Sequence, residues 1–231
     1  MAAGHLPGAA GVPEVTMVTA RSFVREHTTL RAAPFVPEIR LHLADDPLAV
    51  WEETERQLGV TGLAPPFWAF AWAGGQGLAR YVLDHPGVVA GRRVLDVASG
   101  SGLAAIASAM AGAAAVTAAD IDQFAVAAIG LNAAANGVAV TAEPADVLGG
   151  DGDGADVVLA GDVFYHKSLA DRMVPFLDRA RSRGALVLIG DPGRAYLPAG
   201  RLAAQAVYDV PVSRELEDAC TKRVTVWARS G

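Results

Sequence analysis

A glycine-rich turn holds the residues whose types and spacing point most directly to ligand chemistry. It contains Gly100 and Gly102 and follows residues 93–97, an apolar run that predicts a buried strand. Glycines in such a turn let the backbone approach a ligand closely, and the helix predicted over 102–111 presents its amino end there. Ligands of open α/β sheets bind beyond the carboxyl ends of the strands. The turn therefore predicts a binding site.

Asp96, four residues before Gly100, helps to choose the ligand. A carboxylate at this place faces the pyrophosphate of a dinucleotide unfavourably, whereas it accepts hydrogen bonds from an ammonium group. It suits the methionine part of S-adenosylmethionine, which is the expected cofactor. The first alternative is NAD and a nicotinamide-dependent oxidoreductase, because residues 100–105 match the pattern G-x-G-x-x-A. The second is a non-catalytic module that keeps the fold as an interaction surface.

Acidic residues also follow later strands of the predicted sheet. Asp120 ends a strand at the place where a carboxylate binds ribose hydroxyls. Asp122 suits the N-cap of the following helix. Asp146 lies near the expected adenine amino group and can equally be a solvated turn residue. The candidate cofactor-binding residues are Trp72, Asp96, Ala98, Gly100, Gly102, Asp120, Ile121, Asp146 and Val147.

Asp162 and Tyr165 follow the fourth strand of the predicted sheet. In the fold that this pattern implies, their turn is the entrance to the reacting centre. An acidic side chain followed three residues later by tyrosine can orient an amine lone pair for in-line displacement, once burial has lowered the pKa of that amine. An ordinary strand-to-helix turn is the alternative. His166 could accept a proton there, although a solvated histidine at a helix start is the simpler interpretation.

Aromatic residues are dense between residues 66 and 75. Trp72 is as readily a wall of the cofactor site as a core residue, whereas Trp68 is more readily a core residue. The five histidines are scattered, and no Cys, His or Asp spacing is typical of a zinc site. We therefore expect no metal.

Strands alternate with helices from Phe67 onward. Five strands separated by helices predict a parallel sheet with right-handed crossovers, and two final strands joined without a helix predict an antiparallel hairpin at one edge. The expected fold is α/β: a Rossmann-like, seven-stranded, mostly parallel sheet with helices on both faces. The predicted strands cover residues 93–97, 116–119, 138–142, 156–160, 185–190, 206–212 and 223–228. The predicted helices cover residues 73–83, 102–111, 122–136 and 168–183, the last kinked or restarted at Pro175.

The chain divides into three segments by composition. Residues 1–20 are rich in Ala, Gly and Pro and are expected to be disordered. Residues 21–66 form an N-terminal extension that is expected to help form the substrate side, and residues 67–231 form the main domain. Within the extension the pattern predicts a helix over 21–33, a strand over 38–43 and a helix after the N-cap Asp46 and Pro47.

Charge and composition argue against several classes of partner. The chain has 231 residues and a net charge of −6, which argues against a nucleic-acid partner, because such proteins need basic surface. Residues 97–119 are uncharged over a length that could span a membrane, but their glycines and hydroxyl groups favour a turn, a helix and a strand, so no membrane partner is expected. The single Cys220 fits the reducing cytoplasm. Few lysines beside many arginines, alanines and glycines indicate a GC-rich bacterial genome.

The stretches that carry these residues resemble the class I methyltransferases, and more narrowly the seven-β-strand lysine methyltransferases of the electron transfer flavoprotein β-subunit. The matching stretches are residues 36–41, 66–76, 94–102, 120–122, 161–165 and 188–194. Ala98 departs from the pattern, because many class I enzymes have glycine there. The resemblance implies methylation of lysine ε-amines on a protein, with Asp162 and Tyr165 as catalytic residues. A ribosomal protein or a small amine is the alternative acceptor.

Overall fold

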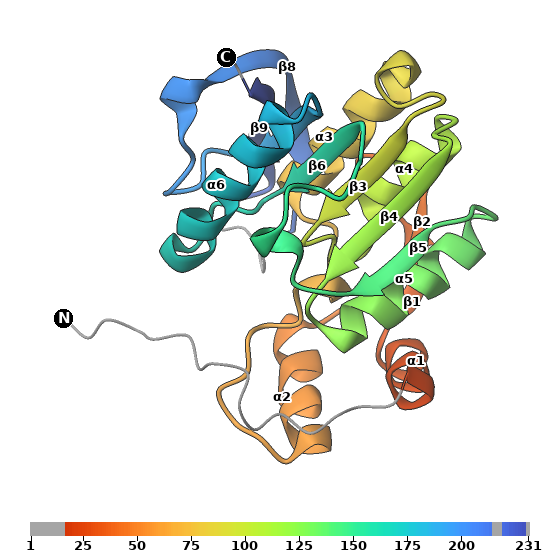
Figure 1. The fold of residues 1–231 in the computed structure, drawn as a ribbon. Coiled ribbons are helices and arrows are strands. Elements are labelled where there is room, and N and C mark those ends of the chain that lie inside the picture. Colours follow the sequence, from red (N-terminus) through yellow and green to blue (C-terminus); the bar gives the residue numbers. More distant parts are fainter. Residues whose placement is uncertain (1–16, 214–218, 230–231) are drawn as a thin grey trace.

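A computed structural model describes residues 17–213 and 219–229 of the chain (Figure 1). Its centre is a seven-stranded sheet in the order β5-β4-β3-β6-β7-β9-β8. The strands are β3 (Arg93–Val97), β4 (Ala115–Asp120), β5 (Thr141–Pro144), β6 (Val157–Gly161), β7 (Leu186–Asp191), β8 (Leu202–Pro211) and β9 (Thr221–Arg229). Neighbours from β5 to β7 pair in parallel, and β9 pairs antiparallel with β7 and β8. The predicted sheet and its edge hairpin are confirmed.

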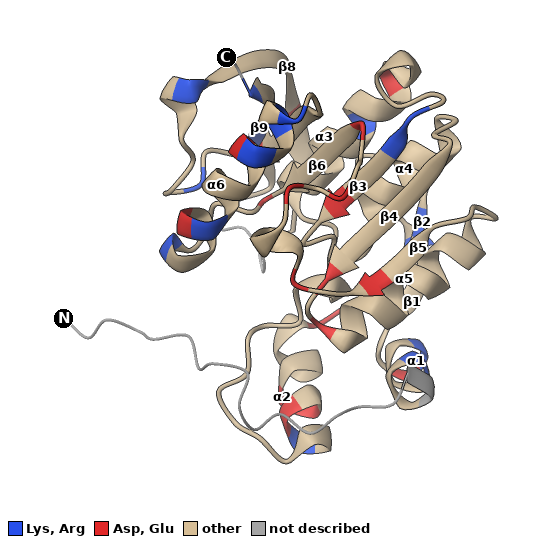
Figure 2. Ribbon diagram, viewed as in Figure 1, with Lys and Arg blue, Asp and Glu red and all other residues tan. Residues whose placement is uncertain are grey.

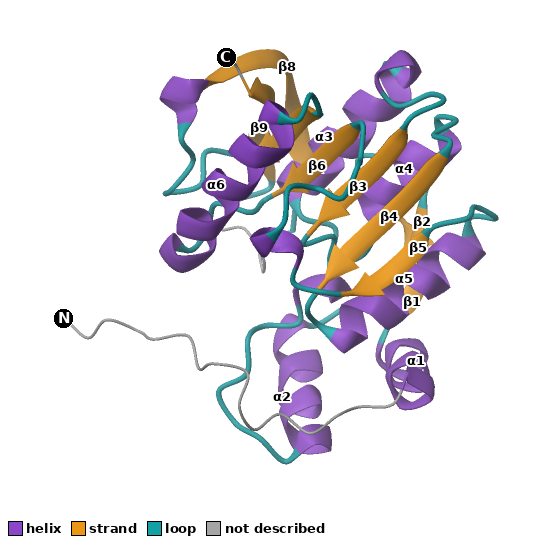
Figure 3. Ribbon diagram, in the orientation of Figure 1, coloured by secondary structure: helices purple, strands orange, loops and turns teal. Residues whose placement is uncertain are grey.

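Helices cover both faces of the sheet, as predicted (Figure 3). Alternate residues of a strand point to opposite faces. Accordingly, Leu159 of β6 belongs to a core shared with α3 (Ala73–Asp84), α4 (Leu103–Met110) and α5 (Gln123–Ala135). Its neighbour Val158 belongs to a second core shared with α6 (Lys167–Ser182). Short 3₁₀ helices occupy Phe67–Ala69 (η1), Pro86–Val88 (η2), Val147–Gly149 (η3) and Ala199–Arg201 (η4).

Two details of the main domain differ from the sequence-based expectation. The helix α6 is continuous although Pro175 lies inside it. Proline removes one helical hydrogen bond, but the buried Met173 and Phe176 on the same helix hold it against the sheet. The third predicted strand, at 138–142, is instead β5 at Thr141–Pro144, an exposed edge strand with little apolar pattern to place it.

The described part of the N-terminal extension contains α1 (Met17–His27), β1 (Thr29–Ala32), β2 (Arg40–Leu43) and α2 (Pro47–Leu58). The predicted strand and the helix after Asp46 are confirmed, since the Asp46 carboxylate accepts hydrogen bonds from the Leu48 and Ala49 N–H groups. The helix predicted over 21–33 is wrong at both ends. The observed helix α1 begins at Met17, inside the segment 1–20 that was expected to be disordered. Residues 1–16 of that segment lie outside the described residues. The helix ends at His27 because the next residues pair with β2.

Two asparagines attach this hairpin to the main domain. The side chains of Asn132 in α5 and of Asn136, the C-cap of that helix one turn later, lie along the edge of β2. Asn132 Oδ1 accepts the His42 N–H at 2.7 Å, and Asn136 Oδ1 accepts the Arg40 N–H at 2.9 Å. Asn132 is fully buried and also donates to the Ser101 carbonyl at 2.8 Å. The extension is therefore joined through one side chain to the glycine-rich turn.

The uncharged run at 97–119 is a turn, the helix α4 and most of β4, as predicted. Within residues 17–213 and 219–229, no helix combines the length and the apolar composition needed to cross a membrane.

Glycines let the amino end of α3 lie against the carboxyl ends of β6 and β7. A methyl group added at Gly74 would overlap the Gly190 carbonyl and would lie 2.6 Å from Asp162 Oδ2. One added at Gly161 would lie 2.9 Å from the Gly75 Cα atom. Helix and strands thus touch through their backbones, at a distance that side chains larger than hydrogen cannot occupy.

This packing predicts opposite effects for two neighbouring substitutions in α3. Gly74→Ala should destabilise the protein by about 1–3 kcal/mol, because the added methyl group has no space. Gly75→Ala should stabilise it by about 0.5–1 kcal/mol, since a Cβ there meets nothing within 4 Å and alanine favours a helix. Urea denaturation followed by circular dichroism measures both. Equal effects at the two positions would contradict the close backbone contact.

Candidate functional site

Acidic side chains gather where the central strands end. β3, β4, β6 and β7 run in parallel, so their carboxyl ends share one edge of the sheet. Figure 2 shows acidic residues at the arrowheads of β3 and β4. The residues at this edge are Asp96, Asp120, Asp162 and Asp191.

Asp96 is buried, and its carboxylate caps the helix that follows the turn. Its Oδ2 atom accepts hydrogen bonds from Ser99 Oγ at 2.5 Å and from the Ala105 N–H at 3.1 Å. Gly102, the N-cap of α4, has no side chain to cap the helix, so Asp96 supplies this acceptor from the preceding strand. Burial raises the pKa of Asp96 to about 7, although both hydrogen bonds favour the ionised form.

Asp120 and Asp122 hold the turn between β4 and α5 through hydrogen bonds from backbone N–H groups. Asp120 accepts the Gly100 N–H at 2.9 Å on one oxygen and the Asp122 N–H at 3.0 Å on the other. Asp122 accepts the Phe124 N–H at 2.8 Å and is the N-cap of α5, as predicted. Burial raises the pKa of Asp120, and burial together with the charge of Asp120 raises that of Asp122 to about 6.

The turn between β3 and α4 uses left-handed backbone at three positions. The φ angles are 52° at Ala98, 56° at Gly100 and 82° at Gly102. Glycine adopts this region freely, whereas for alanine the left-handed conformation costs about 1–2 kcal/mol of stability. A glycine at position 98, which many class I enzymes have, would avoid that strain. Alanine at position 98 therefore lowers the stability of the turn locally without changing its backbone shape.

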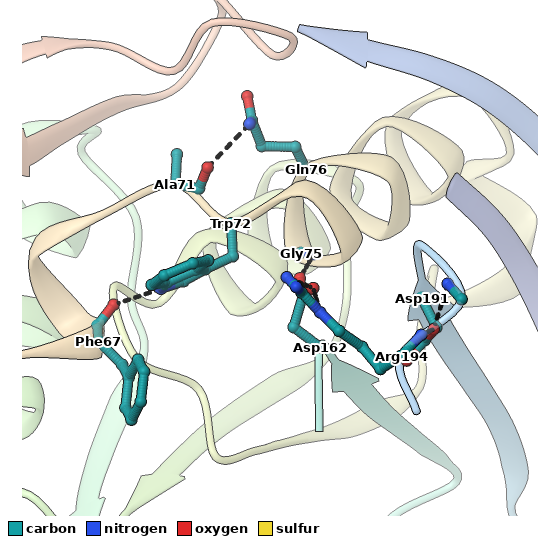
Figure 4. Close-up of polar contacts among 9 residues, drawn as sticks. Phe67, Ala71, Trp72, Gly75, Gln76, Asp162, Asp191 and Arg194 are labelled. Atoms are coloured by element: carbon teal, nitrogen blue, oxygen red, sulfur yellow. Dashed lines mark hydrogen bonds and ion pairs between the residues drawn. The ribbon is translucent and has the colours of Figure 1, made fainter. Parts of the chain in front are cut away.

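Asp162 also has left-handed backbone, with φ 56°, and its carboxylate is buried. Oδ2 accepts the Gly75 N–H at 2.9 Å, in the first turn of α3, so the carboxylate lies at the positive end of that helix (Figure 4). Oδ1 accepts Arg194 Nε at 3.0 Å and Nη2 at 2.7 Å. Burial raises the pKa of Asp162 to about 6, and the charge of Arg194 limits this rise.

Arg194 is the functional candidate that the sequence analysis missed. Its guanidinium lies over the Trp72 ring, 5.9 Å from the ring centre, while it pairs with Asp162. Asp191 Oδ1 accepts the backbone N–H groups of Gly193 and Arg194 at 2.6 and 2.7 Å, which shapes the loop that delivers the arginine. The stretch Gly190-Asp191-Pro192-Gly193-Arg194 was visible as part of the family resemblance, but it carried no role for the arginine.

Aromatic rings form the exposed wall beside these carboxylates. Tyr165 is 45% exposed, and its ring centre lies 5.1 Å from that of Phe67. Phe67 also contacts Trp72, whose indole N–H donates to the Phe67 carbonyl at 2.9 Å. Partial burial and the charge of Asp120 raise the pKa of Tyr165. Asp162 and Tyr165, predicted as a pair, therefore have different neighbours: one is bound inward to Arg194, the other lies at the surface with Phe67.

The remaining residues predicted to bind the cofactor lie at the margin of this cluster of carboxylates. Ile121 is 77% exposed beside Asp120. Asp146 is exposed, is the N-cap of η3 and pairs with Arg172 Nη2 at 2.6 Å. Val147 follows it and packs partly against the α6 core. Trp68 is buried beside Phe124, as the core interpretation predicted.

His166 is the N-cap of α6, where its ring nitrogen accepts the Ser168 N–H, which agrees with the simpler of its two interpretations. Among the described residues, no three His, Cys, Asp or Glu side chains are grouped so that they could hold a metal ion. Two surface hollows, of about 330 and 250 Å³, lie beside α6 and between α1 and α2, rather than over the carboxylates.

Comparisons with known proteins agree with this geometry. Residues 80–178 match the model of the ribosomal protein L11 methyltransferase (PrmA) family. The electron transfer flavoprotein beta subunit lysine methyltransferase of Xenopus laevis is 40% identical over 223 residues, which cover 94% of this chain and 89% of that protein. The Rattus norvegicus protein of the same name is 34% identical over 214 residues, covering 90% and 83%.

A solved structure of the ribosomal protein L11 methylase from Lactobacillus delbrueckii subsp. bulgaricus superposes with a TM-score of 0.51. It covers 70% of this chain and 81% of that one at 22% identity, which shows a shared fold alone. The Xenopus and rat alignments reach much further, because they span nearly the whole chain. They confirm the resemblance inferred from the motif stretches and set aside the oxidoreductase and the non-catalytic module. The chain belongs to the family of electron transfer flavoprotein β-subunit lysine methyltransferases.

Proposed function

We propose that this chain transfers a methyl group from S-adenosylmethionine to lysine ε-amines of the electron transfer flavoprotein β-subunit. The observation that carries the proposal is the 40% identity across 94% of the chain with a relative named for that activity. The carboxylates and aromatic rings at the strand ends supply groups that such a reaction needs. A ribosomal protein or a small amine is the alternative acceptor.

The residues at the glycine-rich turn fit S-adenosylmethionine. Gly100, in the left-handed turn, carries no side chain that would keep a ligand from the backbone, whereas Gly102 lets the turn pack closely against Ile129 of α5. Asp96 is an acceptor for the ligand's ammonium group, and Asp120 is an acceptor for ribose hydroxyls. The exposed Ile121 offers an apolar surface for the adenine ring. Ala98, Asp146 and Val147 complete the proposed cofactor-binding set at its rim, and Trp72 stands beside it.

The bound cofactor would supply a sulfonium methyl group, which an amine lone pair displaces in line. The chain's task is then to hold a lysine side chain so that its nitrogen faces that group. Phe67, Trp72 and Tyr165 provide aromatic surface for the aliphatic part of lysine. Asp162 and Tyr165 are the proposed catalytic residues that orient the amine. The ammonium must lose its proton to solvent before the transfer, which an aromatic, partly dry surrounding favours.

Charge and composition support a protein acceptor, a cytoplasmic location and a bacterial source. The net charge of −6 disfavours a nucleic-acid partner and suits a basic, lysine-bearing segment. The lone cysteine, Cys220, supports a cytoplasmic location. The arginine-rich, lysine-poor composition supports a bacterial source, although the Xenopus and rat relatives are animal proteins.

Incubation with labelled S-adenosylmethionine tests the acceptor directly. We expect label on lysine of recombinant electron transfer flavoprotein β-subunit, located by peptide mass spectrometry. Asp120→Ala should lose the label, because it removes the proposed ribose acceptor. Asp156→Asn, at the opposite end of β6 and 45% exposed at its side chain, should keep it. Label found only on ribosomal protein L11 or on a small amine would replace the proposed acceptor.

A second prediction concerns Asp96. Its pKa is about 7 in the folded protein and 3.8 without burial, so keeping it ionised costs more stability as the pH rises from about 4 to about 7. Asn titrates at neither value. Relative to the parent, Asp96→Asn should therefore gain stability as the pH rises from about 4 to about 7, and the difference should not change further below pH 4. Binding of S-adenosylhomocysteine, measured by calorimetry, should weaken roughly tenfold or more.

Asp156→Asn is the matched control for this measurement. The Arg93 N–H and guanidinium lower the pKa of Asp156, so its ionised form stabilises the fold. Relative to the parent, the Asn variant should therefore lose stability as the pH rises toward about 4, and above pH 4 the difference should stay constant. Relative to the parent, Asp156→Asn thus loses stability with rising pH below about pH 4, whereas Asp96→Asn gains stability between about pH 4 and pH 7. Parallel curves for Asp96→Asn and the parent would refute the burial cost assigned to Asp96.

Ala98→Gly tests the strain in the turn. Removal of the methyl group relieves about 1–2 kcal/mol, and the freer unfolded chain offsets about 0.4–1 kcal/mol of this. We expect a net stabilisation of about 0.5–1 kcal/mol in urea denaturation, with binding of S-adenosylhomocysteine retained. Ala134→Gly, an exposed position of α5, should instead destabilise by about 1 kcal/mol. If both variants lose the same stability, Ala98 is not strained.

A further inference from the structure

The Asp162 carboxylate is held on both of its oxygens before any acceptor arrives. Oδ2 accepts the Gly75 N–H at 2.9 Å, and Oδ1 accepts two guanidinium donors of Arg194 at 3.0 and 2.7 Å. A buried carboxylate without such donors takes up a proton instead of keeping its charge. The arginine therefore decides both the charge and the direction of this group.

Arg194 is itself fixed from two further sides. Its guanidinium lies over the Trp72 ring at 5.9 Å, and its side chain is 20% exposed. Its backbone N–H donates to Asp191 Oδ1 at 2.7 Å, in the turn that follows β7. Figure 4 shows Asp162 below Gly75, between Trp72 and the Arg194 backbone, with the Arg194 side chain reaching the carboxylate from the side of Asp191. A side chain restrained in this way keeps its charge at one place in the site.

The charges around Asp162 are few. Arg194 is its positive neighbour and Asp191 its negative one, from the end of β7. The first turn of α3, which packs against it, carries no acidic side chain. Across the site, the titratable groups also include Tyr165, Asp120, Asp122 and Asp96. Removal of Arg194 would thus leave Asp162 beside a negative group and the partial positive charge of a helix end.

We propose that Arg194 is a positioning residue for methyl transfer: it keeps Asp162 ionised and aligned, and its positive charge offsets that of the carboxylate beside the acceptor amine. This inference rests on the proposed function. An unbalanced carboxylate would hold the lysine as an ammonium, which cannot attack the methyl group. A balanced pair can orient the amine through a hydrogen bond without favouring its protonated form.

The sign of the pH effect follows from both roles. Without Arg194 the pKa of Asp162 rises, so the ionised carboxylate is lost at a higher pH than in the parent. The pKa of the acceptor amine rises too, because a nearby positive charge has been removed. Both changes move the pH profile of kcat/KM to higher pH. An opposite charge at this distance shifts a pKa by about one to three units, which sets the expected displacement.

The test compares the pH profile of lysine methylation for three variants and the parent. Arg194→Met should move the profile upward by about one pH unit or more, and Arg194→Lys, which keeps the charge, should restore most of its position. Arg201→Met is the matched control, since Arg201 pairs with Asp178 at 3.3 Å on the surface and should leave the profile unchanged. A fall in rate at every pH without displacement would overturn the proposal.

A measurement without acceptor separates this inference from the proposed function. Carbon-13 NMR of aspartate-labelled protein, with the Asp162 signal assigned through Asp162→Asn, reports the carboxyl titration directly. Arg194→Met should raise that titration midpoint, and Arg201→Met should not. If the parent methylates no lysine and the midpoint still rises, the proposed function fails alone. An unchanged midpoint in Arg194→Met overturns the role of Arg194, whatever the acceptor is.

Discussion

The amino end of α3 lies against the carboxyl ends of β6 and β7 at backbone distance, and the site depends on that contact. Gly74, Gly161 and Gly190 make the approach sterically possible. The approach places the Gly75 N–H 2.9 Å from Asp162, which is held in left-handed backbone. The same helix begins directly after Trp72, so its position also places the aromatic wall. A shift of α3 by one methyl radius would separate the carboxylate, its helix donor and its arginine.

The site concentrates carboxylates whose ionisation the folded protein disfavours. Burial raises the pKa of Asp96 to about 7 and those of Asp122 and Asp162 to about 6. Backbone N–H groups at the starts of α3, α4 and α5 partly compensate, since helix amino ends favour negative charge. This arrangement costs stability in the free protein, and a ligand with positive groups would relieve it. Folding stability therefore favours the neutral form of these carboxyl groups, whereas binding of a ligand with positive groups favours the ionised form.

Local signals in the sequence were enough for most of the fold and for part of the site. The run Arg93–Val97, the N-caps Asp46 and Asp122 and the glycine turn all follow from neighbouring residues, and the structure has them where predicted. The strand β1 exists because of its pairing with β2, which no local pattern of 21–33 reveals. Arg194 and Asp162 are 32 residues apart, so their pairing depends on the adjacency of β6 and β7.

Asn132 shows why the N-terminal extension cannot be treated as an appendage. Its buried amide accepts from the backbone of β2 and donates to the Ser101 carbonyl inside the glycine turn. Both groups would otherwise be polar atoms without partners at the boundary between hairpin and domain, which is unfavourable in a buried place. One side chain therefore satisfies the edge strand of the extension and the turn of the proposed cofactor site together. The segment before Phe67 and the strand ends of the main domain are parts of one hydrogen-bonded unit.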